Sequence, residues 1–142
     1  MKVSDVMTRS VETVRPDQTA QEAASFMLKA EAGSIPVCEQ DRVIGMITDR
    51  DIAVRGVAEG RGPDCSVREL MSEQVICASE TDSVEDVARR MSEAQVRRVP
   101  VVDENQKLCG IVSLGDLSRE TQSQAANQAL EGVSATGGQH RQ

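Results

Sequence analysis

The stretch G-M-I-T-D-R-D at residues 45–51 and the stretch G-I-V-S-L-G-D at residues 110–116 decide the fold of this 142-residue chain. Each consists of a glycine, two apolar residues, a hydroxyl residue, two variable residues and an aspartate. A hydroxyl three residues before a carboxylate is the pattern of a helix capping box. Both stretches therefore predict the end of a strand followed by the start of a helix.

The repetition extends outward from these stretches over most of the chain. Sliding the sequence by 64 positions aligns residues 3–37 with residues 67–101, and eight of the 35 pairs are identical. One extra residue in the turn at residues 103–107 then shifts the offset to 65, so that Gly45 aligns with Gly110 and Asp51 with Asp116. An internal duplication predicts two similar units that each bury an apolar face.

Each half is predicted to fold as strand, helix, strand, strand and helix. Short apolar stretches at residues 10–14 and 74–78 favour strands, and capping boxes T-A-Q-E and S-V-E-D introduce amphipathic helices. Two strands joined by polar turns then lead into the second helix. The helical core stripes are expected to comprise Ala20, Ala23, Ala24, Met27 and Ala30 in the first half and Val84, Val87, Ala88, Met91 and Ala94 in the second.

These elements divide the chain into four parts. The first repeat is placed at residues 1–59, a Gly- and Pro-containing linker at residues 60–66, and the second repeat at residues 67–121. The polar tail at residues 122–142 is predicted to be disordered.

Composition excludes several classes of function. The net charge is −7, no window is strongly basic, and the chain has one Phe and no Trp or Tyr, so nucleic acid is not an expected partner. Neither a run of about 20 apolar residues nor a signal peptide is present, which predicts a cytoplasmic protein without membrane contact. Catalysis is not expected, because the single histidine, His140, lies in the tail and no phosphate-binding glycine loop occurs.

The ordered set of motifs, occurring twice, resembles a pair of CBS domains, the Bateman module. It covers about residues 1–120, with a V-M-T-like lead, an apolar-Pro-Val strand and a final G-h-h-[ST]-x-x-D in each half. The runs R-R-V-P-V-V-D at residues 97–103 and T-D-R-D-I at residues 48–52 are especially similar to small stand-alone bacterial members. The resemblance implies an α/β (α+β) fold of two tandem repeats packed around a pseudo-twofold axis, commonly as a homodimer.

The same resemblance implies a regulatory module and not an enzyme. Family members hold adenosine-containing ligands such as AMP, ADP, ATP or S-adenosylmethionine in clefts between the repeats. The chain is therefore expected to sense such a nucleotide and to signal to a partner that the sequence does not identify, with no cofactor required. The alternatives are a ligand-free oligomeric scaffold and a thiol-based metal- or redox-responsive module that uses Cys38 and its neighbours.

Two readings stay open for the repeated motif. Thr48 with Asp51, and Ser113 with Asp116, are fully explained as capping boxes. An aspartate at the end of a strand can also accept hydrogen bonds from two vicinal ribose hydroxyls. The resemblance assigns the aspartate to ribose and the Thr or Ser to the neighbourhood of ribose or phosphate.

Prolines and arginines complete the predicted ligand site. Pro36 and Pro100 interrupt strands, where a residue without an N–H is tolerated at edges or bulges. The resemblance assigns the backbone near Ile35 and Val99 to the adenine edge, and an ordinary edge strand is the alternative.

Basic residues differ between the halves. Arg97 and Arg98 are candidates for clamping phosphate, and a solvated pair near a helix C-terminus is the alternative. Gly33 and Ser34 occupy the equivalent positions and cannot neutralise phosphate, so unequal sites are expected. Arg50 is the candidate for charge in the first half, with an exposed helix residue as the alternative.

Overall fold

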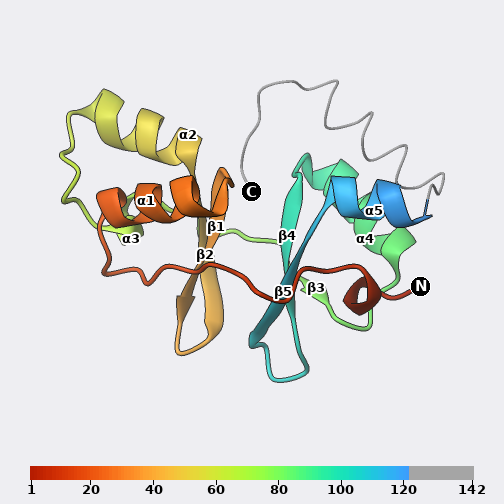
Figure 1. Ribbon diagram of the computed structural model, residues 1–142. Helices are drawn as coiled ribbons and strands as arrows, with labels where there is room; N and C mark the ends of the chain where they lie inside the picture. The colour runs from red at the N-terminus through yellow and green to blue at the C-terminus, as the bar shows by residue number, and fades with distance from the viewer. Residues whose placement is uncertain (122–142) are drawn as a thin grey trace. The chain divides into compact units, whose positions relative to one another are not determined.

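The computed structural model describes residues 1–121, which divide into two compact units. The β1/β2 unit consists of residues 12–75, and the β4/β5 unit consists of residues 1–11 together with residues 76–121 (Figure 1). The tail predicted to be disordered, residues 122–142, lies outside the described residues.

Each unit combines helices with a small sheet, so the α+β prediction is confirmed. The β1/β2 unit contains α1 (Ala20–Ala30), β1 (Ser34–Glu39), β2 (Arg42–Thr48), α2 (Asp49–Asp51), η2 (Ile52–Gly56), η3 (Val57–Glu59) and α3 (Val67–Leu70). The β4/β5 unit contains η1 (Val3–Asp5), β3 (Ala78–Ser79), α4 (Val84–Ala94), β4 (Arg98–Val102), β5 (Leu108–Ser113) and α5 (Leu114–Thr121). In both units two antiparallel strands form the central hairpin.

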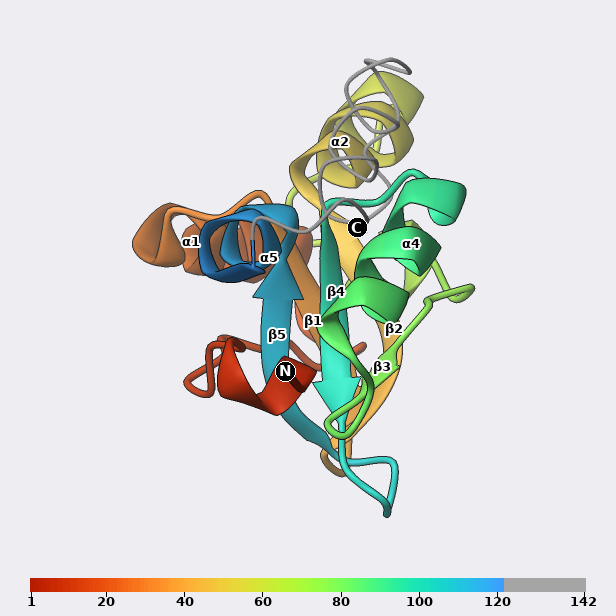
Figure 2. The same ribbon diagram turned by 90° about the vertical axis from the view of Figure 1, so that its right-hand side faces the viewer.

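The segments that lead into the two repeats are exchanged between the units. The first lead, residues 1–11, packs in the β4/β5 unit, where Val3 is fully buried and Thr8 pairs with β5 (Figure 2). The Thr8 N–H donates to the Ile111 carbonyl and the Ile111 N–H donates to the Thr8 carbonyl, both at 2.9 Å. The second lead, residues 67–75, packs in the β1/β2 unit in the same way, through two hydrogen bonds between Met46 and Ser72 at 3.0 and 2.9 Å.

A glycine on the outer strand of each hairpin makes this close approach possible. A Cβ at Gly110 would lie 2.5 Å from the Met7 sulfur and 2.9 Å from the Thr8 carbonyl oxygen. These contacts are far shorter than van der Waals separation, so a side chain at Gly110 would push the first lead off the sheet. Gly45 has the equivalent contacts with the second lead, which explains why each repeated stretch begins with glycine.

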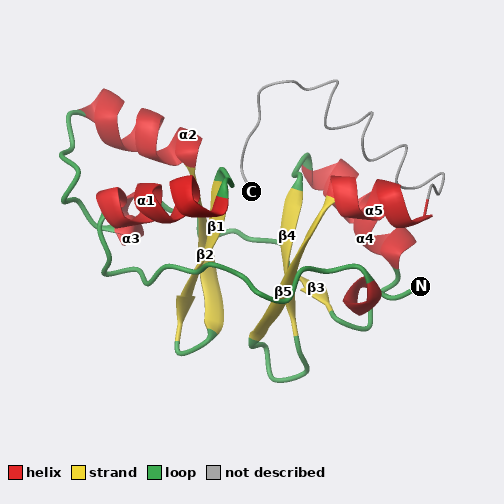
Figure 3. Ribbon diagram, in the orientation of Figure 1, coloured by secondary structure: helices red, strands yellow, loops and turns green. Residues whose placement is uncertain are grey.

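The strands expected at residues 10–14 and 74–78 are much shorter in the structure. The first is reduced to a single parallel bridge between Val14 and Val37, and the second is the two-residue β3 (Figure 3). The physical reason is proline. Val14 donates to the carbonyl of Pro36 at 3.1 Å, but the next bond of a parallel ladder would need an N–H from Pro36 itself. Pro100 ends the β3/β4 ladder at the equivalent place.

Helix starts follow the sequence prediction, whereas one helix body does not. Thr19 and Glu22 form the reciprocal capping box of α1, and Ser83 caps α4 by accepting from the Asp86 N–H at 3.1 Å. The predicted helix after β2 is irregular, because one α turn is followed by the π-helical turn η2 and the 3₁₀ turn η3.

The predicted core stripes are confirmed for α4 and only partly for α1. Met27 and Met91 lie in the cores of their units, as predicted. Ala94 is partly buried, but Ala24 and Ala30 are exposed, so α1 buries a narrower face than its sequence pattern indicates. The rest of that helix surface presents Ala24 and Leu28 to solvent.

Substituting glycines within the β4/β5 unit should separate the effect of the close approach from ordinary helix propensity. We expect Gly110→Ala to lower the free energy of unfolding by roughly 1–3 kcal/mol, because the carbonyl of Thr8 is backbone and cannot move aside cheaply. Gly115→Ala should instead stabilise by about 0.5–1 kcal/mol, because its Cβ would meet only the Ser113 hydroxyl at 3.6 Å in the first turn of α5. Chemical denaturation gives the unfolding free energy of both variants. If the two substitutions changed it by the same amount in the same direction, the proposed close contact between the first lead and Gly110 would be contradicted.

Candidate functional site

Both copies of the repeated motif form a reciprocal capping box. The Asp51 N–H donates to Thr48 Oγ1 at 3.0 Å, and the Thr48 N–H donates to Asp51 Oδ2 at 2.9 Å. The Asp116 N–H donates to Ser113 Oγ at 3.1 Å, and the Ser113 N–H donates to Asp116 Oδ2 at 3.2 Å. The capping interpretation of the motif is therefore confirmed in both units. It leaves the second carboxylate oxygen, Oδ1, outside the cap.

The two carboxylates differ in what their Oδ1 atoms contact. Asp116 Oδ1 pairs at 2.7 Å with Arg119, whose side chain is 73% exposed, so solvent screens this pair. Asp51 Oδ1 lies 3.9 Å from Arg55 Nε, and the guanidinium of Arg55 also donates to the carbonyls of Leu70 and Met71. Burial raises the pKa of Asp51, and its hydrogen bonds with Thr48 and the nearby arginines only partly oppose that shift.

A pocket of about 160 Å³ lies beside the second motif in the β4/β5 unit. It is lined by Thr8, Arg98, Ile111, Val112, Ser113 and Asp116. Three of these were predicted as site residues, namely Arg98, Ser113 and Asp116. They come together because Arg98 lies directly opposite Ser113 across the β4/β5 ladder, while Asp116 is held against Ser113 by the cap.

Thr8 and Ile111 were missed by the sequence prediction. The hydroxyl residue of the V-M-T lead was visible as a repeated feature, because Thr8 aligns with Ser72. What the sequence did not reveal is that the first lead crosses to the β4/β5 unit and thereby supplies one wall of the pocket.

Other predicted site residues lie outside this pocket. Arg97 is exposed, and its carbonyl accepts the Leu114 N–H at 3.0 Å. Val99 belongs to the hydrophobic core of its unit, as Ile35 does in the β1/β2 unit, and both are only 1% exposed. Pro36 and Pro100 are buried in β1 and β4. The side chains of Ile35 and Val99 therefore have no free surface for a ligand in this arrangement.

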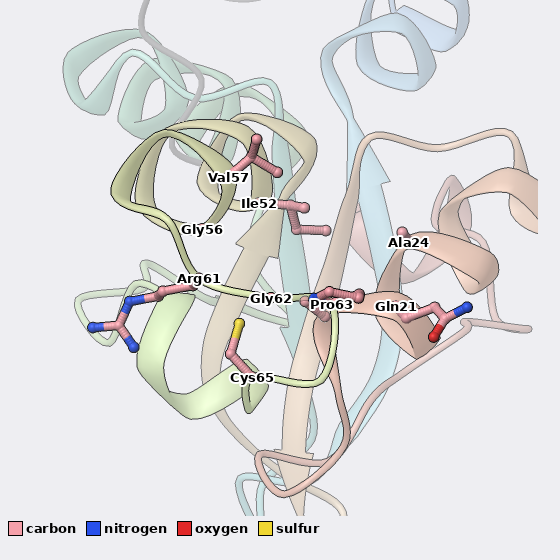
Figure 4. A pocket seen from close by; sticks show the side chains of 10 residues that line it. Gln21, Ala24, Ile52, Gly56, Val57, Arg61, Gly62, Pro63 and Cys65 are labelled. Carbon is pink, nitrogen blue, oxygen red and sulfur yellow. The ribbon is translucent and has the colours of Figure 1, made fainter.

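In the β1/β2 unit the motif and the larger described pocket are separate. Thr48 is buried, Asp51 is half-buried and Arg50 is exposed. A pocket of about 280 Å³ lies between α1, the helical turns η2 and η3, and the linker (Figure 4). Its lining includes Ala24, Val57, Pro63 and Cys65 and none of the predicted site residues.

The four cysteines are free thiols, of which Cys38 is buried and the other three are partly buried. Burial raises the pKa of Cys77. For Cys109, burial together with the neighbouring Glu80 carboxylate raises the pKa to about 11, so this thiol stays protonated at neutral pH.

Within residues 1–121, no three His, Cys, Asp or Glu side chains are grouped so that they could hold a metal ion. None of the helices in that same range is long and apolar enough to cross a membrane.

Comparison with known sequences gives a consistent set of relatives. The CBS domain model matches residues 3–56 and 67–123. The CBS domain-containing protein YhcV of Bacillus subtilis is 46% identical over 133 residues, which cover 93% of this chain and 94% of YhcV. Hypoxic response protein 1 of Mycobacterium tuberculosis is 34% identical over 131 residues, 91% of each chain.

Solved structures agree with the sequence relatives. Hypoxic Response Protein I with two coordinated zinc ions is similar with a TM-score of 0.78 and 35% identity, over 84% of this chain and 98% of that one. The CBS domain pair of protein MJ0100, in complex with 5′-methylthioadenosine and S-adenosyl-L-methionine, gives a TM-score of 0.75 and 31% identity, over 84% and 94%. With two matching repeats and relatives of nearly equal length, the chain belongs to the CBS domain family.

Proposed function

We propose that this chain is a regulatory module that binds an adenosine-containing ligand in the pocket of the β4/β5 unit. The observation that carries the proposal is the convergence of Arg98, Ser113 and Asp116 on one pocket. In this small pocket the guanidinium suits the phosphate of a nucleotide, and the carboxylate can accept hydrogen bonds from its ribose hydroxyls. The hydroxyl can bond to oxygen atoms of either part. The CBS domain pair of MJ0100 was crystallised with two adenosine derivatives, which supports the same ligand class here.

Asp116 is assigned to the ribose hydroxyls. Each carboxylate oxygen has two lone pairs, so Oδ2 can serve the cap while Oδ1 accepts from a ligand. The ion pair of Oδ1 with Arg119 lies at the surface and costs little to exchange. The cap fixes the position of the carboxylate before the ligand arrives, which lowers the entropy that binding must overcome.

Arg98 is assigned to the phosphate, and Thr8 to its neighbourhood. A guanidinium presents a planar set of donors that suits phosphate oxygens. The pocket, at about 160 Å³, is below the roughly 300–1,000 Å³ typical of sites for drug-sized ligands. It fits the ribose-phosphate part, and the base is assigned to the backbone next to Val99 and Pro100 at the same end of β4.

Signalling would follow from the exchanged lead. Thr8 lines the pocket, and four residues later the chain enters the β1/β2 unit at residue 12. A ligand that favours one position of Thr8 thus acts on a segment of the β4/β5 unit that continues directly into the β1/β2 unit. It can shift the module only by its difference in affinity for two arrangements, and a bound partner protein would report that shift.

The module is also proposed to form a homodimer through the helical face of the β1/β2 unit. Leu28 is 81% exposed and Val57 is 72% exposed, and apolar side chains gathered on one exposed face mark interaction surfaces. Ala24 and Val57 line the pocket of about 280 Å³ on the same face, and a second copy would remove this apolar surface from water.

Asp116→Ala should separate capping from ligand binding. Loss of the cap alone predicts a fall in unfolding free energy of about 1 kcal/mol with little change in affinity. Loss of a ribose contact predicts a dissociation constant for AMP at least about tenfold higher, equivalent to about 1.4 kcal/mol. Calorimetry with AMP, beside thermal unfolding of the free protein, measures both quantities.

Asp51→Ala is the matched control, because it removes an equivalent cap from the unit that lacks Arg97 and Arg98. It should change AMP affinity less than Asp116→Ala does. AMP, ADP, ATP and S-adenosylmethionine all failing to bind the wild-type protein at millimolar concentration would refute the proposed function.

Light scattering should give about twice the chain mass of 15.3 kDa at tens of micromolar protein. Ala24→Glu places a charge on the proposed interface and should yield a monomer, because an unpaired charge is costly to bury. Ala30→Glu makes the same change at an exposed position outside the pocket lining and should leave the dimer intact. A monomeric wild-type protein, or equal effects of the two variants, would rule out this interface.

A further inference from the structure

The end of the β1/β2 hairpin has the same backbone framework as the end of the β4/β5 hairpin, but its side chains carry different charges. Ser34 lies opposite Thr48, as Arg98 lies opposite Ser113. The Asp49 N–H donates to the Gly33 carbonyl at 2.9 Å, and the Leu114 N–H donates to the Arg97 carbonyl at 3.0 Å. The two frameworks therefore match, and the side chains on them can be compared position by position.

The comparison shows an exchange of cations for an anion. Arg97 and Arg98 are replaced by Gly33 and Ser34, while the apolar Leu114 is replaced by Asp49. The Asp49 carboxylate lies over Gly33, because a Cβ at Gly33 would be 2.8 Å from Asp49 Oδ2. One of its oxygens, Oδ1, accepts the Arg50 N–H at 2.8 Å, and the Arg50 side chain is exposed.

A buried hydroxyl independently indicates a ligand here. Ser34 is only 7% exposed, and within the described residues its Oγ has no hydrogen-bond partner. Buried polar atoms without a partner are rare in folded proteins. Directly opposite residues of an antiparallel ladder point to the same face, so Ser34 Oγ points to the face on which Thr48 and Asp51 form their cap.

We propose that this end of the β1/β2 hairpin binds an adenosine derivative whose 5′ substituent is neutral or cationic, with Asp49 and Ser34 as specificity-determining residues. The inference rests on the proposed function, since it assumes that Asp51 serves ribose as Asp116 does. A 5′ phosphate would meet the carboxylates of Asp49 and Asp51 without a guanidinium at positions 33 and 34. A sulfonium or ammonium group would be attracted by Asp49, and Ser34 Oγ would bond to either kind of ligand.

The test uses three probes that share adenosine and differ in 5′ charge: AMP, 5′-methylthioadenosine and S-adenosylmethionine. Asp49→Asn keeps the size of the side chain and removes its charge. We expect its dissociation constant for S-adenosylmethionine to rise at least about fivefold, with 5′-methylthioadenosine and AMP changed less than about twofold. Asp41→Asn is the matched control, because it makes the same charge change in the turn at the opposite end of the hairpin and should alter none of the three affinities.

Ser34→Ala and Arg98→Ser complete the set. Ser34→Ala should leave the thermal stability of the free protein unchanged or higher, because the hydroxyl has no partner to lose, and should weaken both 5′-methylthioadenosine and S-adenosylmethionine. Arg98→Ser should weaken AMP and leave S-adenosylmethionine unaffected.

Failure of this inference differs from failure of the proposed function. Binding of AMP without 5′-methylthioadenosine or S-adenosylmethionine would overturn the inference alone. So would an equal loss of both sulfur-containing probes in Asp49→Asn, or a loss of S-adenosylmethionine in Arg98→Ser. If none of the three probes binds the wild-type protein, the inference is overturned, and if ADP and ATP also fail to bind, the proposed function falls with it.

Discussion

Backbone hydrogen bonds between Thr8 and Ile111, and between Ser72 and Met46, close the outer edges of the two hairpins. An open strand edge exposes unpaired N–H and carbonyl groups. The lead of the first repeat covers the edge of the β4/β5 hairpin, and the lead of the second repeat covers the edge of the β1/β2 hairpin. Gly110 and Gly45 are small enough for Met7 and Met71 to lie against the strands. The same contact brings Thr8 to the pocket, so one constraint secures both the sheet and one wall of the candidate site.

The opposite edge of each hairpin is limited by proline. Val14 and Ala78 pair with β1 and β4 just beyond Pro36 and Pro100, where donors are again available. A proline in a central strand normally removes a ladder bond. Here the missing N–H of each proline would face the short parallel pairing with Val14 or Ala78, not the long antiparallel ladder of the hairpin. The sheet therefore tolerates the proline. The backbone around each proline consequently has fewer partners inside the sheet than a regular strand would have.

The sequence predicted local features well because each depends on a few neighbouring residues. The capping boxes at Thr48 and Ser113 and the extra residue in the second turn all follow from spacing along the chain. The exchange of leads could not be predicted in this way. Met7 fits against a glycine, but both Gly45 and Gly110 offer the same space, and only the folded chain shows which one it contacts. The exposure of Ala24 likewise depends on what α1 packs against, which its periodicity does not reveal.

The repeated motif also shows how a duplicated frame can diverge without losing stability. Each cap uses Oδ2, the Thr or Ser hydroxyl and two backbone N–H groups, and none of these atoms belongs to the side chains at positions 49, 50, 114 or 115. Those positions are therefore free to change charge while the carboxylate stays in place. Arg98 and Asp49 lie near these fixed carboxylates and give the corresponding ends of the two hairpins different local charges. Cap and ligand contact are not competing roles, because a carboxylate held by its own helix start is already positioned for a ligand.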